Sequence, residues 1–289
     1  MVPDSAPQAT VNAQQRLVID TTDPRMWRIT FDHPPLNLID GRTISELTGA
    51  LDALEQDPDV RVVVFDSAVP DFFLAHYDVA AAPFPNAPAA GPTGLPPWLD
   101  VLARIAEGPF VSIAKIRGRA RGAGSEFVLA CDMRYASREQ TVLAQPEIGL
   151  GLVAGGAPTH RLPFLTGRGR ALEIMLTGLD YDADLAERYG YVDRAVPDIG
   201  LDGFVTGVAQ RIASFDKAAL VEVKNFVGEV SLPARDLQAR TNRAFWASAA
   251  RPASRRRLGA AQEQGLGRPG DFEMRMGRHL PGLDDADGL

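Results

Sequence analysis

Apolar residues along the chain follow two different spacings, and the two alternate over its first two-thirds. Short runs of β-branched and aromatic residues predict strands, whereas apolar residues three and four positions apart predict helices. The expected strands span residues 16–20, 25–31, 61–65 and 111–116, and the expected helices between and after them begin near Thr43, Trp98 and Glu126. The run at 61–65 is continuously apolar, which is typical of a strand covered on both faces. The alternation predicts an α/β fold.

The ends of these elements carry their own signals. Thr43 is followed three residues later by Glu46, the pattern of a capping box, so Thr43 is the expected N-cap of its helix. Residues 1–14 are polar and aperiodic, which predicts a disordered leader. Six prolines lie between Pro83 and Pro97. They exclude regular structure, so we expect residues 81–97 to form a long loop.

The last third of the chain is expected to be helical. Helical spacing is found over residues 171–176, 184–189, 201–213, 217–227 and 236–264. From about residue 232 on, apolar positions such as Leu237, Phe245 and Leu258 need to be covered. Neither a sequence repeat nor a linker divides the chain into separate domains.

Composition narrows the function. The 289 residues are 45% hydrophobic and 23% charged, which excludes a wholly disordered chain. A net charge of −7 argues against a nucleic-acid partner, and no run approaches the roughly 20 apolar residues of a membrane span. The first residues lack the pattern of a signal peptide, and the single cysteine, Cys131, suits a reducing compartment, so a cytoplasmic protein is expected. The four histidines show no spacing typical of a metal site.

Two glutamates stand out because their neighbours are apolar. Glu126 lies in GAGSEFVLAC and Glu147 in QPEIGLGLVAGG. An ionised carboxylate is costly in such surroundings, so its pKa tends to rise and it becomes a candidate acid or base. Partial exposure, or pairing with an arginine such as Arg121 or Arg161, is the alternative explanation for either one alone.

Small residues precede the first of these glutamates, at Gly122, Ala123 and Gly124. At a turn from strand to helix they let a ligand approach the backbone, where the first N–H groups of the helix favour developing negative charge. This arrangement suits an oxyanion hole, although tight packing of helix on strand explains the same glycines. The GK[ST] ending of a phosphate loop is absent.

The run IAKIRGRARGAGSEFVLACDMRYAS and the later run AQPEIGLGLVAGGAPTHRLPFLTGRGRALEIMLTG together resemble the enoyl-CoA hydratase/isomerase (crotonase) superfamily. The resemblance extends from the first strands through residue 230 and is most specific over 113–178. It implies a spiral of ββα units over residues 15–230, followed by a helical C-terminal region over 231–289. It also implies thioester substrates and an oxyanion hole of two backbone amides.

Carried over residue by residue, the resemblance assigns catalysis to Glu126 and Glu147 and the two amides to Tyr77 and Ala123. Further residues are implied to line the substrate: Ala75, His76, Asp78 and Gly122. His76 and Tyr77 stand where relatives commonly have Gly and Ala, and Ala123 stands where glycine is usual. These differences place bulk beside the thioester.

Both glutamates together favour a hydratase, which adds water reversibly and syn to a 2-enoyl-CoA. An enoyl-CoA isomerase, another crotonase-type lyase, or a catalytically silent binding protein of the same fold are the alternatives. The resemblance implies no metal or other cofactor, since coenzyme A enters as part of the acyl-CoA substrate. It further implies a homotrimer or a dimer of trimers, in which the C-terminal helices cover either a neighbouring subunit or their own active site.

Overall fold

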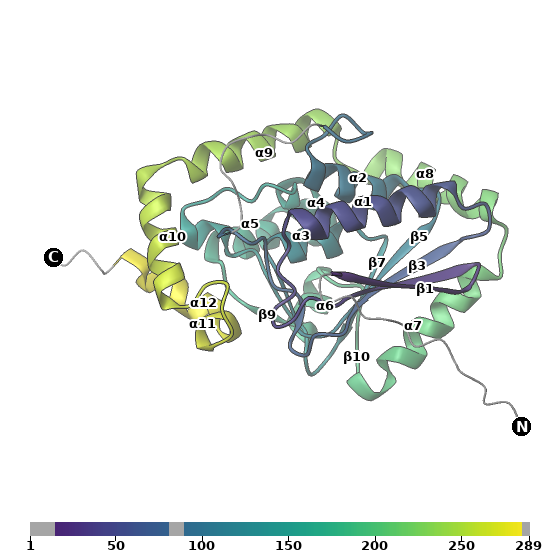
Figure 1. The fold of residues 1–289 in the computed structure, drawn as a ribbon, viewed down its shortest axis with the longest axis horizontal. Helices are drawn as coiled ribbons and strands as arrows, with labels where there is room; N and C mark the ends of the chain where they lie inside the picture. Colours follow the sequence, from purple (N-terminus) through teal and green to yellow (C-terminus); the bar gives the residue numbers. More distant parts are fainter. Residues whose placement is uncertain (1–14, 81–89, 285–289) are drawn as a thin grey trace, which may run out of the picture.

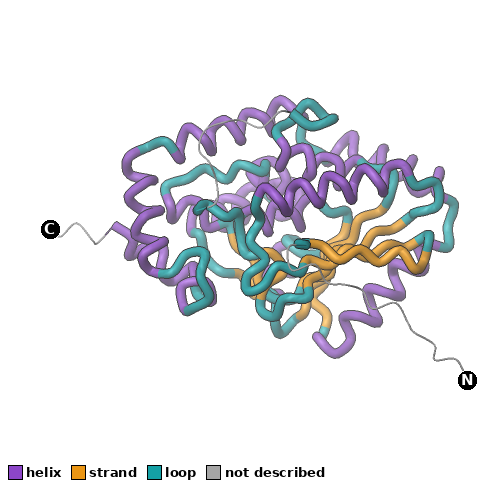
Figure 2. The backbone as a smooth tube through the Cα atoms, in the orientation of Figure 1, coloured by secondary structure: helices purple, strands orange, loops and turns teal. Residues whose placement is uncertain are grey.

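The computed structural model describes residues 15–80 and 90–284, and their strands form two sheets (Figure 1 and Figure 2). The larger sheet has the order β1 (Leu17–Asp23), β2 (Met26–Phe31), β3 (Val62–Ser67), β5 (Val111–Ile116), β7 (Met133–Ser137) and β10 (Arg194–Val196). The smaller sheet has the order β4 (Phe72–Leu74), β6 (Arg119–Arg121), β8 (Val142–Ala144) and β9 (Tyr181–Asp182). Only the β1–β2 and β8–β9 pairs among these strands are antiparallel.

From β3 to β8 the chain alternates between the two sheets. β3, β5 and β7 join the larger sheet, and the strand that follows each of them, β4, β6 or β8, joins the smaller one. A helix follows each of the first two pairs: α2 (Pro97–Glu107) after β4 and α3 (Ala123–Ala130) after β6. This repeat of two strands and a helix confirms the expected spiral of ββα units.

The larger sheet is covered on both faces, as the apolar run in β3 predicts. Val62 and Val64 pack against α7 (Asp198–Ala213) on one face. Val63 and Phe65 point to the other face, into the core beneath α1 (Gly41–Gln56), α2 and α3. Figure 1 shows α1 and α2 on the opposite side of the sheet from α7.

The start of α1 corrects one expectation. Its N-cap is Asp40, whose carboxylate accepts the Thr43 N–H at 2.7 Å, so Thr43 is not the cap. Glu46 does not complete a capping box, because its Oε2 accepts the backbone N–H groups of Arg16 (2.8 Å) and Leu17 (3.1 Å). The carboxylate therefore links α1 to β1 instead of to its own helix.

The rest of the chain is mainly helical, as expected. The helices before the C-terminal region are η1 (Pro146–Leu150), α4 (Pro158–Thr166), α5 (Arg168–Thr177), α6 (Ala183–Tyr189) and α8 (Lys217–Ser231). Those within it are α9 (Arg235–Ala249), α10 (Pro252–Gln264), α11 (Asp271–Met274), α12 (Met276–His279) and η2 (Leu280–Asp284). The long helical stretch expected over 236–264 is divided between α9 and α10, where Pro252 begins a new helix.

The C-terminal helices cover the chain's own η1 segment. Leu150 and Leu152 share a buried cluster with Phe272, Met276 and Leu280. Figure 1 shows α10 to α12 gathered at the end of the molecule near the C-terminus, with α9 running from that end toward α2. These helices therefore pack on a segment of their own chain, the one that carries η1. Residues 1–14 and 81–89, the expected leader and part of the expected loop, lie outside the described residues.

Candidate active site

The three sequence segments singled out above meet at one edge of the smaller sheet. β4, β6 and β8 are parallel neighbours, so their carboxyl ends lie side by side. The segments that leave these ends are 75–78, 122–126 and 145–147. Ligands commonly bind outside the carboxyl ends of parallel strands, because the following loops converge there. The topology therefore creates one candidate site from three distant parts of the sequence.

Gly122 is the point where the segments touch. Its φ of 50° lies in the region that favours glycine, and a Cβ built on it would lie 3.0 Å from Glu147 Oε1 and 3.8 Å from His76 Cβ. Its N–H donates to Ala144 O at 3.0 Å, which holds the turn against β8. The turn thus carries the chain from β6 into α3 while leaving room for the carboxyl group of Glu147.

The two backbone N–H groups that the sequence resemblance assigns to an oxyanion hole donate no hydrogen bond to any of the described residues. They belong to Tyr77 and to Ala123, the first residue of α3. On either side of Tyr77 the backbone is bound to Ile39: Ile39 N donates to His76 O (2.9 Å) and Asp78 N donates to Ile39 O (2.8 Å). Because the Ala123 N–H lies at a helix N-terminus, it favours negative charge nearby.

Glu126 projects from the first turn of α3 and is 3% exposed. Its Oε2 accepts the indole N–H of Trp98 at 3.0 Å, and its Oε1 accepts the Gly156 N–H at 2.6 Å. Burial raises the pKa of Glu126, whereas these two hydrogen bonds oppose that rise because they favour the ionised form. A Cβ at residue 156 would overlap the carboxyl group, so glycine there makes room for it.

Glu147 lies in η1, and its carboxyl group approaches Gly122. Burial and the nearby charge of Glu126 raise the pKa of Glu147 from 4.5 to about 8. Two carboxyl groups whose charges influence one another in this way titrate as a pair. Since Glu126 receives the two strong donors, we assign the pair's negative charge at neutral pH to Glu126 and its proton to Glu147.

A buried series of side-chain hydrogen bonds ends at the carboxyl group of Glu147. The side-chain amide of Gln145 lies 2.9 Å from Ser125 Oγ and 3.1 Å from Glu147 Oε2, and Ser125 is bonded in turn to the Tyr191 hydroxyl. With Glu147 protonated, the amide oxygen accepts its proton, and with Glu147 ionised, the reversed amide donates to it. Gln145 can therefore satisfy both forms of the carboxyl group.

The chain matches the enoyl-CoA hydratase/isomerase family over residues 22–258. The chain belongs to this family. A solved structure of a candidate enoyl-CoA hydratase from Streptomyces avermitilis is 40% identical, with a TM-score of 0.88, over 94% of this chain and 99% of the other.

More distant structures agree in fold. An enoyl-CoA hydratase/isomerase from Pseudoalteromonas atlantica is 23% identical, with a TM-score of 0.77, over 89% of this chain and 100% of the other. An enoyl-CoA hydratase from Bacillus anthracis is 24% identical, with a TM-score of 0.69, over 90% of this chain and 100% of the other.

In this family member, the segments that carry the residues singled out by the sequence resemblance lie at the carboxyl ends of neighbouring strands, and Glu147 and His76 both approach Gly122. The pairing of Glu126 with Arg121, considered as an alternative, is wrong, because Arg121 binds Asp180 at 2.8 Å. The side chain of Ala75 is buried in an apolar cluster, and the Asp78 carboxylate accepts the Ala80 N–H at 2.9 Å.

Three contacts of the site were not expected from the sequence: Trp98 and Gly156 at Glu126, and Gln145 at Glu147. A signal existed for two of them. A tryptophan in an apolar helix carries one N–H that needs an acceptor when buried. Gln145 immediately precedes the Pro-Glu pair, so its side chain emerges from the same strand end.

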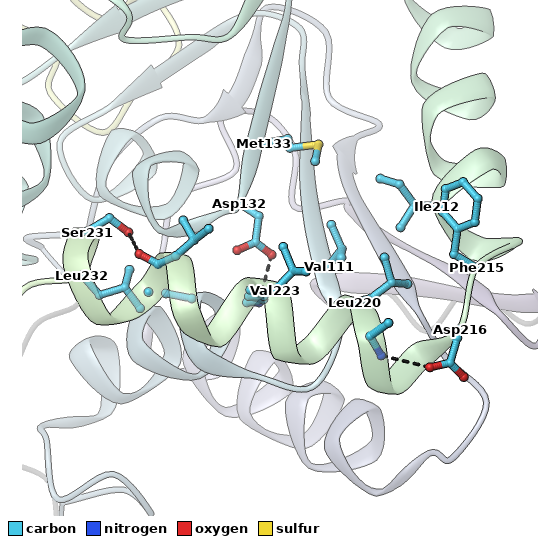
Figure 3. A pocket seen from close by; sticks show the side chains of 15 residues that line it. Val111, Asp132, Met133, Ile212, Phe215, Asp216, Leu220, Val223, Ser231 and Leu232 are labelled. Atoms are coloured by element: carbon cyan, nitrogen blue, oxygen red, sulfur yellow. Dashed lines mark hydrogen bonds and ion pairs between the residues drawn. The ribbon is translucent and has the colours of Figure 1, made fainter.

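A separate apolar groove of about 660 Å³ runs along α8, bordered by β5 and the end of α7 (Figure 3). Leu220, Val223 and Met133 line it, and none of its lining residues belongs to the three segments above. Within the described ranges, no three His, Cys, Asp or Glu side chains are grouped to hold a metal ion. No helix in those ranges is both long and apolar enough to span a bilayer.

Proposed function

We propose that the protein is an enoyl-CoA hydratase, which adds water reversibly across the 2,3-double bond of an enoyl-CoA thioester. The observation that carries this proposal is the convergence of two carboxyl groups with unequal surroundings. Glu126 receives two hydrogen bonds that favour its ionised form, whereas the pKa of Glu147 is raised to about 8. Hydration needs one base and one acid at the same place, and this pair supplies both.

In the direction of hydration, the proposed reaction uses one glutamate as the base and the other as the acid. Glu126 removes a proton from water as the water oxygen bonds to C3, and the electrons of the double bond shift toward the thioester oxygen. Glu147 then delivers its proton to C2. The pair holds one proton before and after the reaction, so exchange of that proton from Glu126 to Glu147 restores the starting state.

The free N–H groups of Tyr77 and Ala123 have a role in the same scheme. They would bind the thioester oxygen, where negative charge develops when water adds. Loss of one such donor typically slows a reaction by about 10²–10³-fold. With the charge held in this way, the proposed reaction uses no metal or redox cofactor, and coenzyme A takes part only as the carrier of the acyl group.

The test is an assay of crotonyl-CoA and of longer and branched enoyl-CoA esters, with product identification by mass. Loss of the conjugated double bond with the gain of one water supports hydration. A shifted double bond at unchanged mass supports an isomerase and refutes the proposal. Binding of CoA esters without turnover supports a silent family member and also refutes it.

Glu126→Gln and Glu147→Gln test the assignment of the pair. Each is expected to lower kcat by about 10²–10⁴-fold, the usual contribution of a general acid or base. The matched control is Glu229→Gln, which changes an exposed glutamate on α8 and should leave kcat unchanged. Near-normal hydration by either site variant, with an unchanged unfolding temperature, would exclude the two-glutamate mechanism.

A further inference from the structure

We infer that His76 is a positioning residue for the backbone amide of Tyr77, and that Glu273 of the C-terminal region holds the His76 ring in place. The inference rests on the proposed function, because that function gives the Tyr77 N–H its role at the thioester oxygen. Both side chains act through the backbone of the loop, so neither is assigned a contact with the substrate.

The two residues form a buried pair across the molecule. His76 is 7% exposed and Glu273, in α11, is fully buried. His76 Nε2 lies 2.9 Å from Glu273 Oε1, and His76 Nδ1 lies 2.8 Å from the carbonyl oxygen of Tyr77. The pair joins the loop after β4 to a helix 197 positions later in the chain.

The contacts fix the protonation of the ring. A carbonyl oxygen only accepts, so Nδ1 must donate to Tyr77 O. Glu273 Oε1 also accepts the Gly267 N–H at 2.7 Å, which favours an ionised carboxylate, so Nε2 must donate as well. A ring that donates from both nitrogens is an imidazolium, which makes this contact a buried ion pair. Without it, the buried carboxylate of Glu273 would keep only the Gly267 N–H and the nearby charge of Arg121, because its Oε2 has no hydrogen-bond partner among the described residues.

The bond from Nδ1 closes a ring that contains the peptide group between His76 and Tyr77. That peptide group carries the free Tyr77 N–H. Its carbonyl end is already fixed, because His76 O accepts the Ile39 N–H, and in a trans peptide the N–H points the opposite way. The next peptide is fixed as well, since Asp78 N donates to Ile39 O. His76 therefore completes the set of bonds that orients the Tyr77 N–H.

The other charges facing His76 are few. Arg121 is fully buried beside the pair, and its guanidinium is bound to Asp180 (2.8 and 3.0 Å) and to the backbone oxygen of Glu273. Burial and Arg121 lower the pKa of His76, but the charge and hydrogen bond of Glu273 and the bond to Tyr77 O raise it overall. The bond from the Arg121 guanidinium to Glu273 O thus anchors α11, the helix that supplies the Glu273 carboxylate.

The kinetic test compares two substitutions of nearly equal size. His76→Leu removes the donor to Tyr77 O and is expected to lower kcat by about 10- to 100-fold with little change in KM, because the misplaced amide matters mainly in the transition state. His76→Asn keeps a side-chain N–H near the position of Nδ1 and is expected to recover most of this loss. A purely space-filling role for His76 predicts equal kcat values for the two variants, and that result would overturn the inference.

The matched control lies in the same C-terminal segment. His279 forms a similar contact with Asp271 at 2.9 Å, but the pair is exposed and does not contact the loop at 75–78. His279→Asn is therefore expected to leave kcat unchanged. A loss equal to that of His76→Leu would show a general effect of the segment and would overturn the specific role of His76.

Nitrogen NMR of the imidazole groups tests the pair directly and does not depend on activity. Both ring nitrogens of His76 are expected to be protonated at neutral pH. In Glu273→Gln the ring should lose its proton at a lower pH, because the charge that holds it is gone. A neutral His76 ring in the unchanged protein at neutral pH, or an identical titration in the variant, would refute the assignment.

The two proposals fail in different ways. If the unchanged protein hydrates no enoyl-CoA, the proposed function is wrong, and the His76 variants are then compared by their affinity for acetoacetyl-CoA, whose enolate presents a similar oxyanion. Weaker binding by His76→Leu than by His76→Asn supports the positioning role in that case. Equal affinities would overturn it.

Discussion

Replacing Trp98 by phenylalanine isolates one of the two bonds that keep Glu126 ionised. The indole is 9% exposed, donates its N–H to Glu126 Oε2 at 3.0 Å, and stacks near the ring of Phe127 with centroids 6.4 Å apart. Phenylalanine keeps an aromatic ring at this position and removes only the donor. The variant therefore changes the electrostatics of Glu126 more than the packing around it.

The expected magnitude follows from the charge on the acceptor. A hydrogen bond to a charged group contributes about 1.5–3 kcal/mol, and one pKa unit corresponds to about 1.4 kcal/mol. Loss of the Trp98 bond should therefore raise the pKa of Glu126 by about one to two units. Since the proposed base must be ionised, the acid side of the pH profile of kcat/KM should move to higher pH by the same amount.

The assay is hydration of crotonyl-CoA across the acid and neutral range, with unfolding measured in parallel. Trp27→Phe is the control, because Trp27 is equally buried at 9% but lies in β2, away from the glutamates. It should lower stability without moving the pH profile. If Trp98→Phe lowers kcat/KM by the same factor at every pH, the bond does not set the ionisation of Glu126, and the reasoning fails.

Two further substitutions test the geometry and the charge of the pair. Gly156→Ala should lower kcat about 100-fold with little change in unfolding temperature, because the new Cβ displaces the mobile end of Glu126 and not a backbone atom; normal activity would show that the carboxylate needs no such room. Glu147→Gln should change the pH dependence of stability. Folding raises the pKa of Glu147 from 4.5 to about 8, so the folded protein binds more protons than the unfolded chain in that window and loses stability as pH rises through it. Residue 147 cannot titrate in the variant, so the variant should exceed the parent in free energy of unfolding above pH 8 by up to a few kcal/mol, and the difference should vanish below pH 4.5. Urea unfolding that gives the same difference between variant and parent at both pH extremes would contradict this.

The elements with several periodic turns or alternations could be predicted from the sequence. The strand expected at 111–116 is β5, and the helix expected to begin near Trp98 is α2, which begins one residue earlier. The strands that deliver the site could not be predicted. β4, β6 and β8 contain three residues each, too few to show a spacing of two, and only their place in the spiral makes them strands.

The candidate site likewise contains some residues that could be predicted from the sequence and others that could not. Glu126 and Glu147 could be found because a charged residue in an apolar run is visible in one dimension. Trp98 could not be linked to Glu126, because the contact joins two helices 28 positions apart and helical spacing alone accounts for the tryptophan. Gly156 is one of several glycines in its segment, and only the close approach of a carboxyl group distinguishes it.

The C-terminal region shows how an apolar pattern leaves its partner undetermined. The apolar residues of its helices must be buried, and the sequence alone permitted packing against either a neighbouring subunit or the chain's own site. Two glycines permit close contacts within the chain: a Cβ at Gly149 would overlap Leu280, and one at Gly155 would lie 2.9 Å from Phe245. Gly149 lies two residues after Glu147, and Gly155 directly precedes Gly156. The contacts that bury the C-terminal helices therefore also shape the segment that supports the two glutamates. The packing that buries the C-terminal helices therefore also assembles the site. This explains why a helix near the end of the chain can supply a buried partner, Glu273, to the loop that follows β4.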